Sequence, residues 1–310
     1  MRASFFLFLS FWLLAVAASA QPISGTVTNA ATRAGLPYVN IGVVGQDLGT
    51  VSTENGAYQL GFREALAQDT VRISSVGYQT RLLTLRALQV QPNVALAPES
   101  VRLQEVQVQG KNLFRRNLTL GNTGNSETST LSLKTEDLGA EIGTVIALKR
   151  RPTRLLTANF NVAYNKRGPI TLRVNLYRLD AKGQPTETKL LARDLIVTSE
   201  VTKGVISVDL TKEKLVVDED FFLAVEWITS GAPAGVPLAA SATPMKTKVY
   251  RTEVEALAAQ EGLGFSISLG YANNDLYVRK TSQGAWDRAT VGAVLLGMQP
   301  RISFFVTAQD

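Results

Sequence analysis

The stretch S-T-E-N-G-A-Y at residues 52–58 decides how the N-terminal part of this chain folds. Asn55 and Gly56 form the dipeptide most typical of a two-residue β-hairpin, because a type I′ turn needs positive φ angles at both central positions. Residues 50–51 before the turn and 58–60 after it alternate as strands do. The stretch therefore predicts a tight connection between two strands, and its single acid cannot supply the several oxygen ligands of a calcium site.

Residues 22–108 around this turn are rich in Val, Ile and Thr, and Gly, Pro and Asn interrupt them at short, regular intervals. Such spacing predicts a small β-sandwich. Arg63–Gln68 is the exception, because we expect a single helical turn there. The predicted strands lie within ISGTVTN, YVNIGVV, GAYQLGF, DTVRISSVGY, TRLLTL, NVAL and LQEVQV.

The order of these elements resembles the carboxypeptidase regulatory-like domain, a transthyretin-like, Ig-like β-sandwich, over residues 23–108. The shared motifs are a G-x-V strand at its start, a Leu-Pro pair before a V-x-I-x-V strand, and the Asn-Gly-x-Tyr turn. A Ser-x-x-Gly-Tyr sequence at residues 74–78 and a closing L-x-E-V-x-V strand at 103–108 complete the pattern. In its known settings this module is non-catalytic, so the resemblance carries over no catalytic residue.

The resemblance implies a setting in the envelope of Gram-negative bacteria, where such a module begins TonB-dependent outer-membrane receptors and many surface proteins. It also follows the catalytic domain of some metallocarboxypeptidases. This chain differs from both arrangements. Residues 109–310 are too few for the plug and barrel of a receptor, and the zinc of a metallocarboxypeptidase needs histidine ligands, which the sequence lacks.

The first 20 residues have the layout of a secretory signal peptide. Arg2 supplies a basic n-region, an apolar core follows, and Ala18-Ser19-Ala20 is a small-x-small cleavage site. The apolar run is short for a membrane span, and no cysteine follows it to carry a lipid anchor. An uncleaved N-terminal anchor is the alternative. We expect an exported protein in the periplasm, at the periphery of the outer membrane or at the cell surface.

The 310 residues contain neither cysteine nor histidine. This composition excludes disulfides, Cys/His zinc sites, Ser-His-Asp triads and Cys-His pairs, and leaves paired carboxylates, Lys or Tyr bases, or oxygen-ligated metals. The net charge is +6, with basic clusters at Lys111–Arg116 and Leu148–Arg154. Because these clusters hold a single aromatic residue, we expect solvated charge or contact with an anionic envelope surface, and no nucleic-acid partner.

Alternation of apolar and polar residues returns after residue 131, as at Leu156–Tyr164, and predicts a second, larger antiparallel β-sandwich. Its pattern broadly resembles carbohydrate-binding or adhesin-like jelly rolls. Residues 220–228 are apolar on both faces except at Glu226, so we expect a central strand, and Arg251–Gln260 predicts a helix. The all-β chain is thus expected to comprise a signal peptide over residues 1–20, a carboxypeptidase regulatory-like domain over 21–109, a linker over 110–130 and a jelly-roll-like sandwich over 131–310.

The acidic run Asp218, Glu219 and Asp220 is the candidate metal site, because calcium prefers several hard oxygen ligands. Its spacing is not that of an EF-hand, and a charged turn leading into the next strand is the simpler interpretation. We expect no other cofactor.

Five residues are candidates for ligand binding. Tyr271, Asn273, Asn274 and Asp275 could hydrogen-bond a sugar, or could form a hairpin loop with the Asx geometry of Asn and Asp. Trp286 lies in a loop-like context, where it could stack on a sugar or peptide or fold back onto the core.

Glu226 raises an enzymatic alternative, because jelly-roll glycosidases use two facing strand carboxylates. No second acid lies two or four residues away along its strand, so we expect an Arg or Lys partner, or an exposed edge. The neighbouring Trp227 lies on the same strand face as Phe221, Leu223 and Val225, so we expect it in the core.

The predicted function is that of a non-catalytic exported protein for binding, adhesion or envelope assembly, with a polysaccharide or an envelope protein as partner. Two alternatives stay open: a carboxylate-dependent glycoside hydrolase, and a small outer-membrane β-barrel formed by residues 131–310. Short strands, few aromatic residues and the polar end Gln309-Asp310 count against the barrel. We therefore expect a protein peripheral to the outer membrane rather than spanning it.

Overall fold

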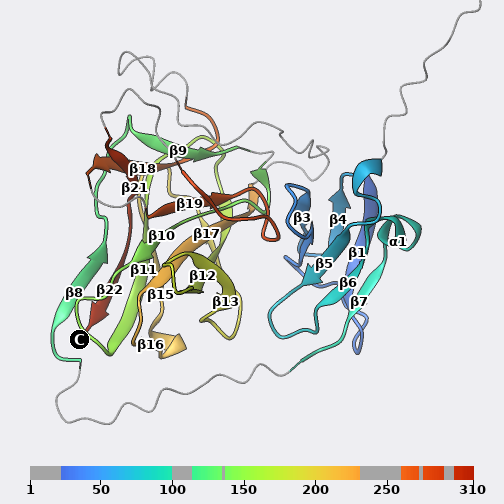
Figure 1. Ribbon diagram of the computed structural model, residues 1–310, viewed down its shortest axis with the longest axis horizontal. Helices are drawn as coiled ribbons and strands as arrows, with labels where there is room; N and C mark the ends of the chain where they lie inside the picture. Colours follow the sequence, from blue (N-terminus) through green and yellow to red (C-terminus); the bar gives the residue numbers. More distant parts are fainter. Residues whose placement is uncertain (1–21, 100–113, 135–136, 231–259, 272–274, 290–296) are drawn as a thin grey trace, which may run out of the picture.

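The computed structural model shows two β-domains side by side, the first drawn in blue to teal and the second in green to red (Figure 1). The expected signal peptide, the closing strand at 103–108 and residues 251–259 of the expected helix lie outside the part that the structure describes. Among the described helices, none combines the length and apolar character needed to cross a membrane. The structure describes residues 22–99, 114–134, 137–230, 260–271, 275–289 and 297–310.

The first domain is the expected β-sandwich. Its elements are β1 (Ile23–Asn29), β2 (Asn40–Val43), β3 (Gly49–Val51), β4 (Ala57–Leu60), the 3₁₀ turn η1 (Glu64–Leu66), β5 (Thr70–Ser74), β6 (Arg81–Thr84), α1 (Leu85–Val90) and β7 (Val94–Leu96). One sheet has the order β4-β1-β7 and the other β3-β2-β5-β6. Alternate residues of both sheets, such as Val27, Ile41 and Ile73, are fully buried in one core.

The helical turn expected within Arg63–Gln68 is confirmed as η1, whereas the sequence does not predict α1. Thr84 ends β6, and its hydroxyl oxygen accepts a hydrogen bond from the Ala87 N–H at 3.1 Å, which begins a helix at once. Six residues are too few to show a helical period, so the segment resembles strand in the sequence. Leu85 and Leu88 carry α1 into the core.

The turn at residues 52–58 differs from the expected hairpin. β3 pairs with β2 and β4 pairs with β1, so the turn takes the chain from one sheet to the other. Only Gly56 has a positive φ, of 79°, and Asn55 does not, so the type I′ assignment is wrong. The Gly56 N–H donates to the Thr53 oxygen at 2.9 Å, and the Thr53 N–H to the Ala57 oxygen at 2.8 Å. This is the pattern of a type I turn followed by a left-handed glycine.

The second domain is the expected larger sandwich of two antiparallel sheets. One sheet follows β13-β12-β17-β10-β19-β20, with β14 on β12; the other follows β21-β18-β11-β22-β8, with β15 and β16 on β11 and β9 on β18. The elements are β8 (Asn117–Gly121), β9 (Thr130–Leu133), β10 (Glu141–Ile146), β11 (Thr153–Asn165), β12 (Ile170–Leu179), β13 (Pro185–Lys189), β14 (Leu195–Ser199), β15 (Gly204–Asp209), the 3₁₀ turn η3 (Thr211–Glu213), β16 (Val216–Val217), β17 (Phe221–Ser230), β18 (Leu263–Gly270), β19 (Leu276–Arg279), β20 (Asp287–Arg288), β21 (Gln299–Ile302) and β22 (Phe304–Gln309).

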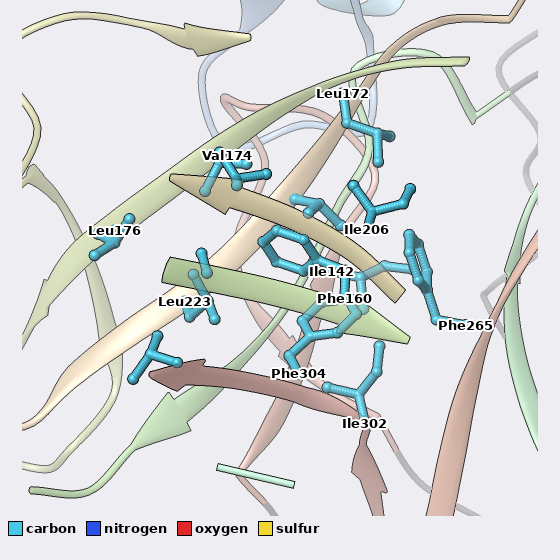
Figure 2. Close-up of a cluster of buried hydrophobic side chains, with 14 of the residues drawn as sticks. Ile142, Phe160, Leu172, Val174, Leu176, Ile206, Leu223, Phe265, Ile302 and Phe304 are labelled. Atoms are coloured by element: carbon cyan, nitrogen blue, oxygen red, sulfur yellow. The ribbon is translucent and has the colours of Figure 1, made fainter. Parts of the chain in front are cut away.

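A continuous apolar core fills the space between these two sheets (Figure 2). Phe304 lies at its centre, because its ring meets those of Phe160 and Phe265 edge-on, with centroids 4.9 and 5.0 Å apart. Leu172 and Leu223 approach from the opposite sheet. Trp227 is fully buried in the same cluster, as expected. β17 lies between β12 and β10, which confirms the predicted central strand.

Two boundaries differ from the sequence-based expectation. β8 lies within residues 110–130, the expected linker, but pairs with β22, so the second sandwich begins before residue 131. Along β11 the register shifts between Leu155 and Thr157. This bulge places Leu155 in the core, where simple alternation had predicted Leu156.

We predict that Gly56→Ala destabilises the first domain. Its positive φ alone costs a residue with a side chain about 1–2 kcal/mol, and an added Cβ would lie 2.3 Å from the Val27 carbonyl oxygen. Chemical denaturation should therefore show a loss larger than that range. Gly77→Ala is the matched control, because Gly77 has a φ of 84° but nothing lies within 4 Å of its added Cβ. Equal losses in the two variants would contradict a role for the Val27 contact.

Candidate functional site

The outer face of the β12-β17-β10-β19 part of the second domain carries charged side chains that are nevertheless buried. Strand alternation turns Leu172 and Val174 inward and therefore turns Arg173 outward. Glu141 and Glu226 have no exposed surface, and Arg173 is 1 % exposed. Charges this deeply buried destabilise a protein unless they are paired and hydrogen-bonded. The partners of these groups therefore define the site.

Glu226 pairs with a base, as the sequence predicted. Arg173 lies directly opposite it on β12, and the Arg173 Nη1 donates to the Glu226 Oε2 at 2.7 Å. On its other side the Arg173 Nε lies 3.2 Å from the Asp194 Oδ1. The guanidinium thus lies between two carboxylates, one fully buried and one partly exposed.

Glu141 has the same arrangement on the neighbouring strand. Arg279 of β19 lies opposite it and approaches one carboxylate oxygen with two nitrogens, Nη2 at 2.6 Å and Nε at 3.2 Å. The Tyr177 hydroxyl donates to the other oxygen at 2.9 Å. Arg279 also donates from Nη1 to Glu187 at 2.6 Å. A second carboxylate–guanidinium pair therefore lies beside the first.

The two glutamates face each other across β10 and β17. The Asn175 side-chain nitrogen donates to both, at 3.2 Å to Glu141 and 3.4 Å to Glu226. A search for acids along the strand of Glu226 cannot find Glu141, because strand order, not sequence spacing, brings them together. Burial raises the pKa of the Glu141 carboxyl; the Arg279 guanidinium opposes this rise, and the charge of Glu226 adds to it.

Arg173 also connects this cluster to the first domain. Its Nη1 donates to the Asn40 side-chain oxygen at 2.9 Å, and its Nη2 donates to the Tyr38 carbonyl oxygen. Tyr38 has a φ of 56°, a conformation that aromatic residues rarely adopt. One side chain therefore satisfies an acid in its own domain and two acceptors in the other.

A second set of contacts joins the domains beside Arg173. The turn at residues 281–284 rests on β2 and β3, where the Gly45 N–H donates to the Gln283 oxygen at 2.9 Å. Gly49 permits this approach, since an added Cβ would lie 2.8 Å from the Thr281 side chain. Lys280 and Asp47 form an ion pair of 2.7 Å at the margin. Polar contacts, together with the absence of a side chain at Gly49, bring the two sandwiches against each other.

Trp286 packs over the charged cluster. Its ring meets Phe222 edge-on with centroids 4.8 Å apart, and the Arg279 guanidinium lies 4.2 Å from its centre. The side chain is partly buried. Trp286 is thus placed to cover the ion pairs, and its stacking on a ligand stays a prediction.

The other ligand-binding candidates lie between β18 and β19. Tyr271 is 77 % exposed, and Asp275 is partly buried, which raises the pKa of its carboxyl. Asn273 and Asn274 lie outside the described residues. Because β18 and β19 belong to different sheets, the connection crosses the sandwich and is not the expected hairpin loop. Of the two candidates that the structure describes here, Tyr271 presents its ring to solvent.

The acidic run ahead of β17 makes local contacts. Asp220 accepts a hydrogen bond from the Leu148 N–H at 3.0 Å and one from Arg151 at 2.9 Å. Glu219 lies 3.8 Å from the Arg178 guanidinium. In the part of the chain that the structure describes, no three acidic side chains are grouped so as to hold a metal ion. These contacts match those of a charged turn.

We predict that Arg173→Met lowers the free energy of unfolding by about 3–5 kcal/mol, because it leaves Glu226 buried without its counter-charge. The double variant Arg173→Met/Glu226→Gln should lose less, since it removes both charges and keeps the side-chain volumes similar. Urea denaturation of the two variants and of Glu226→Gln completes the cycle. If the double variant is as unstable as the two single losses added together, the pair makes no direct contribution.

We also predict that Glu141 changes the pH dependence of stability. Because its folded-state pKa is raised, the folded protein holds this proton more tightly than the unfolded chain does. The stability of the wild type relative to Glu141→Gln should be greatest below the ordinary carboxyl pKa and should fall as the pH rises above it. Asp209→Asn should show the opposite slope, because hydrogen bonds from Thr211 lower the Asp209 pKa. Parallel curves for wild type and Glu141→Gln would refute the assignment.

The known proteins that resemble this chain do so in part of its length or weakly. No curated protein matches it. A structure of the cysteine protease and lectin-like domains of Cwp84, a surface layer associated protein of Clostridium difficile, is 12 % identical, with a TM-score of 0.34, and the match covers 55 % of this chain and 32 % of that one. A clostridial Cwp84 cysteine protease after propeptide cleavage is 10 % identical, with a TM-score of 0.28, over 92 % of this chain and 61 % of that one. Each match spans less than two thirds of the solved chain. Residues 23–108 match the model of the CarboxypepD_reg-like domain and are the carboxypeptidase regulatory-like domain expected from their sequence.

Proposed function

We propose that this protein is a non-catalytic, exported binding or adhesion protein of the cell envelope, in which two β-domains act as one rigid unit. The observation that carries the proposal is the buried junction. Glu141 and Glu226 are the acids best placed for paired-carboxylate chemistry, yet each is fully buried and bound to an arginine. A general acid or base must come within hydrogen-bond reach of its substrate. The buried charges at this junction are therefore better suited to holding the two domains together than to catalysis.

A rigid junction favours binding. Loops that extend from a rigid scaffold bind ligands with little loss of conformational freedom. The Arg173 contacts with Tyr38 and Asn40 hold the first domain at one position against the second. Two sets of loops would then reach a ligand in a fixed geometry.

The ligand that we favour is a polysaccharide or an envelope protein, and the location is the periphery of the outer membrane. The signal-like first 20 residues and the regulatory-like module, which is non-catalytic in the settings known for its family, support this proposal. Tyr271 offers an exposed ring of the kind on which sugars stack.

A carboxylate-dependent glycoside hydrolase is the second candidate. The facing positions of Glu141 and Glu226 favour it, since such enzymes need two carboxylates near one glycosidic bond. Their burial and their arginine partners oppose it, because a glycosidic bond would have to reach them.

We predict that the chain from residue 21 onward captures a ligand from a glycan array or an envelope extract and releases it chemically unchanged. If the ligand is a glycan, Tyr271→Ala should weaken binding about two- to tenfold, as for loss of one aromatic contact. Val205→Ala, another exposed apolar side chain, is the control and should bind normally. Cleavage of a captured glycan that stops in Glu226→Gln would replace the proposal with the hydrolase. Failure to capture either class would contradict a binding function.

A further inference from the structure

The outer face of the first domain's β3-β2-β5-β6 sheet is half covered. Strand register places Gly49, Gly42, Arg72 and Leu82 in one row across it. The turn at residues 281–284 of the second domain rests on the two glycines, and an added Cβ on Gly42 would lie 3.0 Å from the Gln283 side chain. Arg72 and Leu82 continue the same row beyond this contact. The open half of the sheet is therefore continuous with the interface between the domains.

A groove of about 830 Å³ occupies this open half. Val44 and Leu82 give it apolar walls and are 50 % and 62 % exposed. Arg72 and Asp69 supply its charges, and both are partly buried. Val44 and Leu82 line the same groove, and exposed apolar side chains that lie together can mark a contact site.

Arg72 is the group in the groove most suited to recognition. Its guanidinium makes no hydrogen bond or ion pair with any residue in the described ranges, in contrast to Arg173 and Arg279. A partly buried guanidinium without a partner binds a carboxylate well, because its planar donors match the two carboxylate oxygens. Asp69 in the same groove disfavours a uniformly acidic ligand. The charges therefore suit a ligand with one acid among neutral or basic groups.

The edge of the sheet offers backbone groups to the same ligand. β6 is the last strand on this side in the described part of the chain. The Leu85 N–H donates to the Asp69 oxygen at 3.0 Å, and hydrogen bonding alternates along an antiparallel pair. Leu83 therefore faces β5, and the N–H and C=O of Leu82 face the open edge. Such an edge can accept one more strand.

We propose that an extended peptide segment of an envelope protein adds to β6 as a fifth strand and places one acidic side chain on Arg72. Two strand spacings separate the added strand from β5, about 10 Å, a span that an arginine and a glutamate side chain cover together. The ion pair would then lie over Leu82, which is the cross-strand neighbour of Arg72 on β6. The inference rests on the proposed binding function but assigns it to the first domain.

The test uses the chain from residue 21 onward and two fluorescent octapeptides of alternating valine and threonine, one with a central glutamate and one with glutamine there. Fluorescence anisotropy should show the glutamate peptide binding about three- to tenfold more tightly. Arg72→Gln should abolish this preference. Arg81→Gln is the control. It also removes one positive charge, at a residue of β6 that does not line the groove, and the preference for the glutamate peptide should persist in it. Thermal unfolding confirms that both variants fold.

Three results would overturn the inference. The glutamate preference could survive in Arg72→Gln, which would place the acid elsewhere. The chain could form dimers without binding either peptide, which would assign the groove to a second copy. It could instead capture glycans equally well with and without Arg72 and ignore both peptides. This last result would leave the proposed binding function intact, so that the two proposals fail separately.

Discussion

One guanidinium, that of Arg173, connects the buried charges of the second domain with acceptors in the first. It binds Glu226 within its own sheet and two oxygen acceptors, those of Asn40 and Tyr38, in the other domain. A buried arginine needs hydrogen-bond acceptors within the protein for its N–H donors, because those donors cannot reach water. The position of the first domain is thereby coupled to the charge balance of the second domain's sheet.

The two faces of that sheet follow different rules. The inner face is apolar and is stabilised by burial, which has no preferred direction. The outer face depends on paired charges, whose geometry is strict but whose net stabilisation is small once desolvation is counted. The register matters more on the outer face, since Glu141 meets Arg279, and Glu226 meets Arg173, as direct cross-strand neighbours. We interpret the ionic face as a device for alignment.

Local patterns in the sequence were sufficient for the fold class. Alternation along β11 predicts a sandwich, and the burial of Trp227 follows from its place in the apolar strand β17. The need of Glu226 for a basic partner also follows from its lone charge in an apolar strand. Even so, alternation could not locate the bulge after Leu155, because a bulge adds one residue without changing composition.

Long-range geometry could not be predicted in the same way. The meeting of Glu141 with Glu226, and of Arg173 with Asn40, depends on strand order and on how two separate cores dock. The turn at Asn55 is a second case in which the local sequence could not predict the structure. Its dipeptide favours a hairpin, but the flanking strands belong to different sheets. Tertiary structure therefore overrode a strong local preference.

The glycine pair on β2 and β3 has a consequence for modularity. The sheet of the first domain is seated on the second domain through Gly42 and Gly49, which lie against Gln283 and Thr281. A side chain at Gly49 would come within 2.8 Å of Thr281, and one at Gly42 within 3.0 Å of Gln283, so both positions favour glycine at this contact. A homologous module with larger residues at these two positions would therefore need the turn at residues 281–284 to shift before it could take the same place.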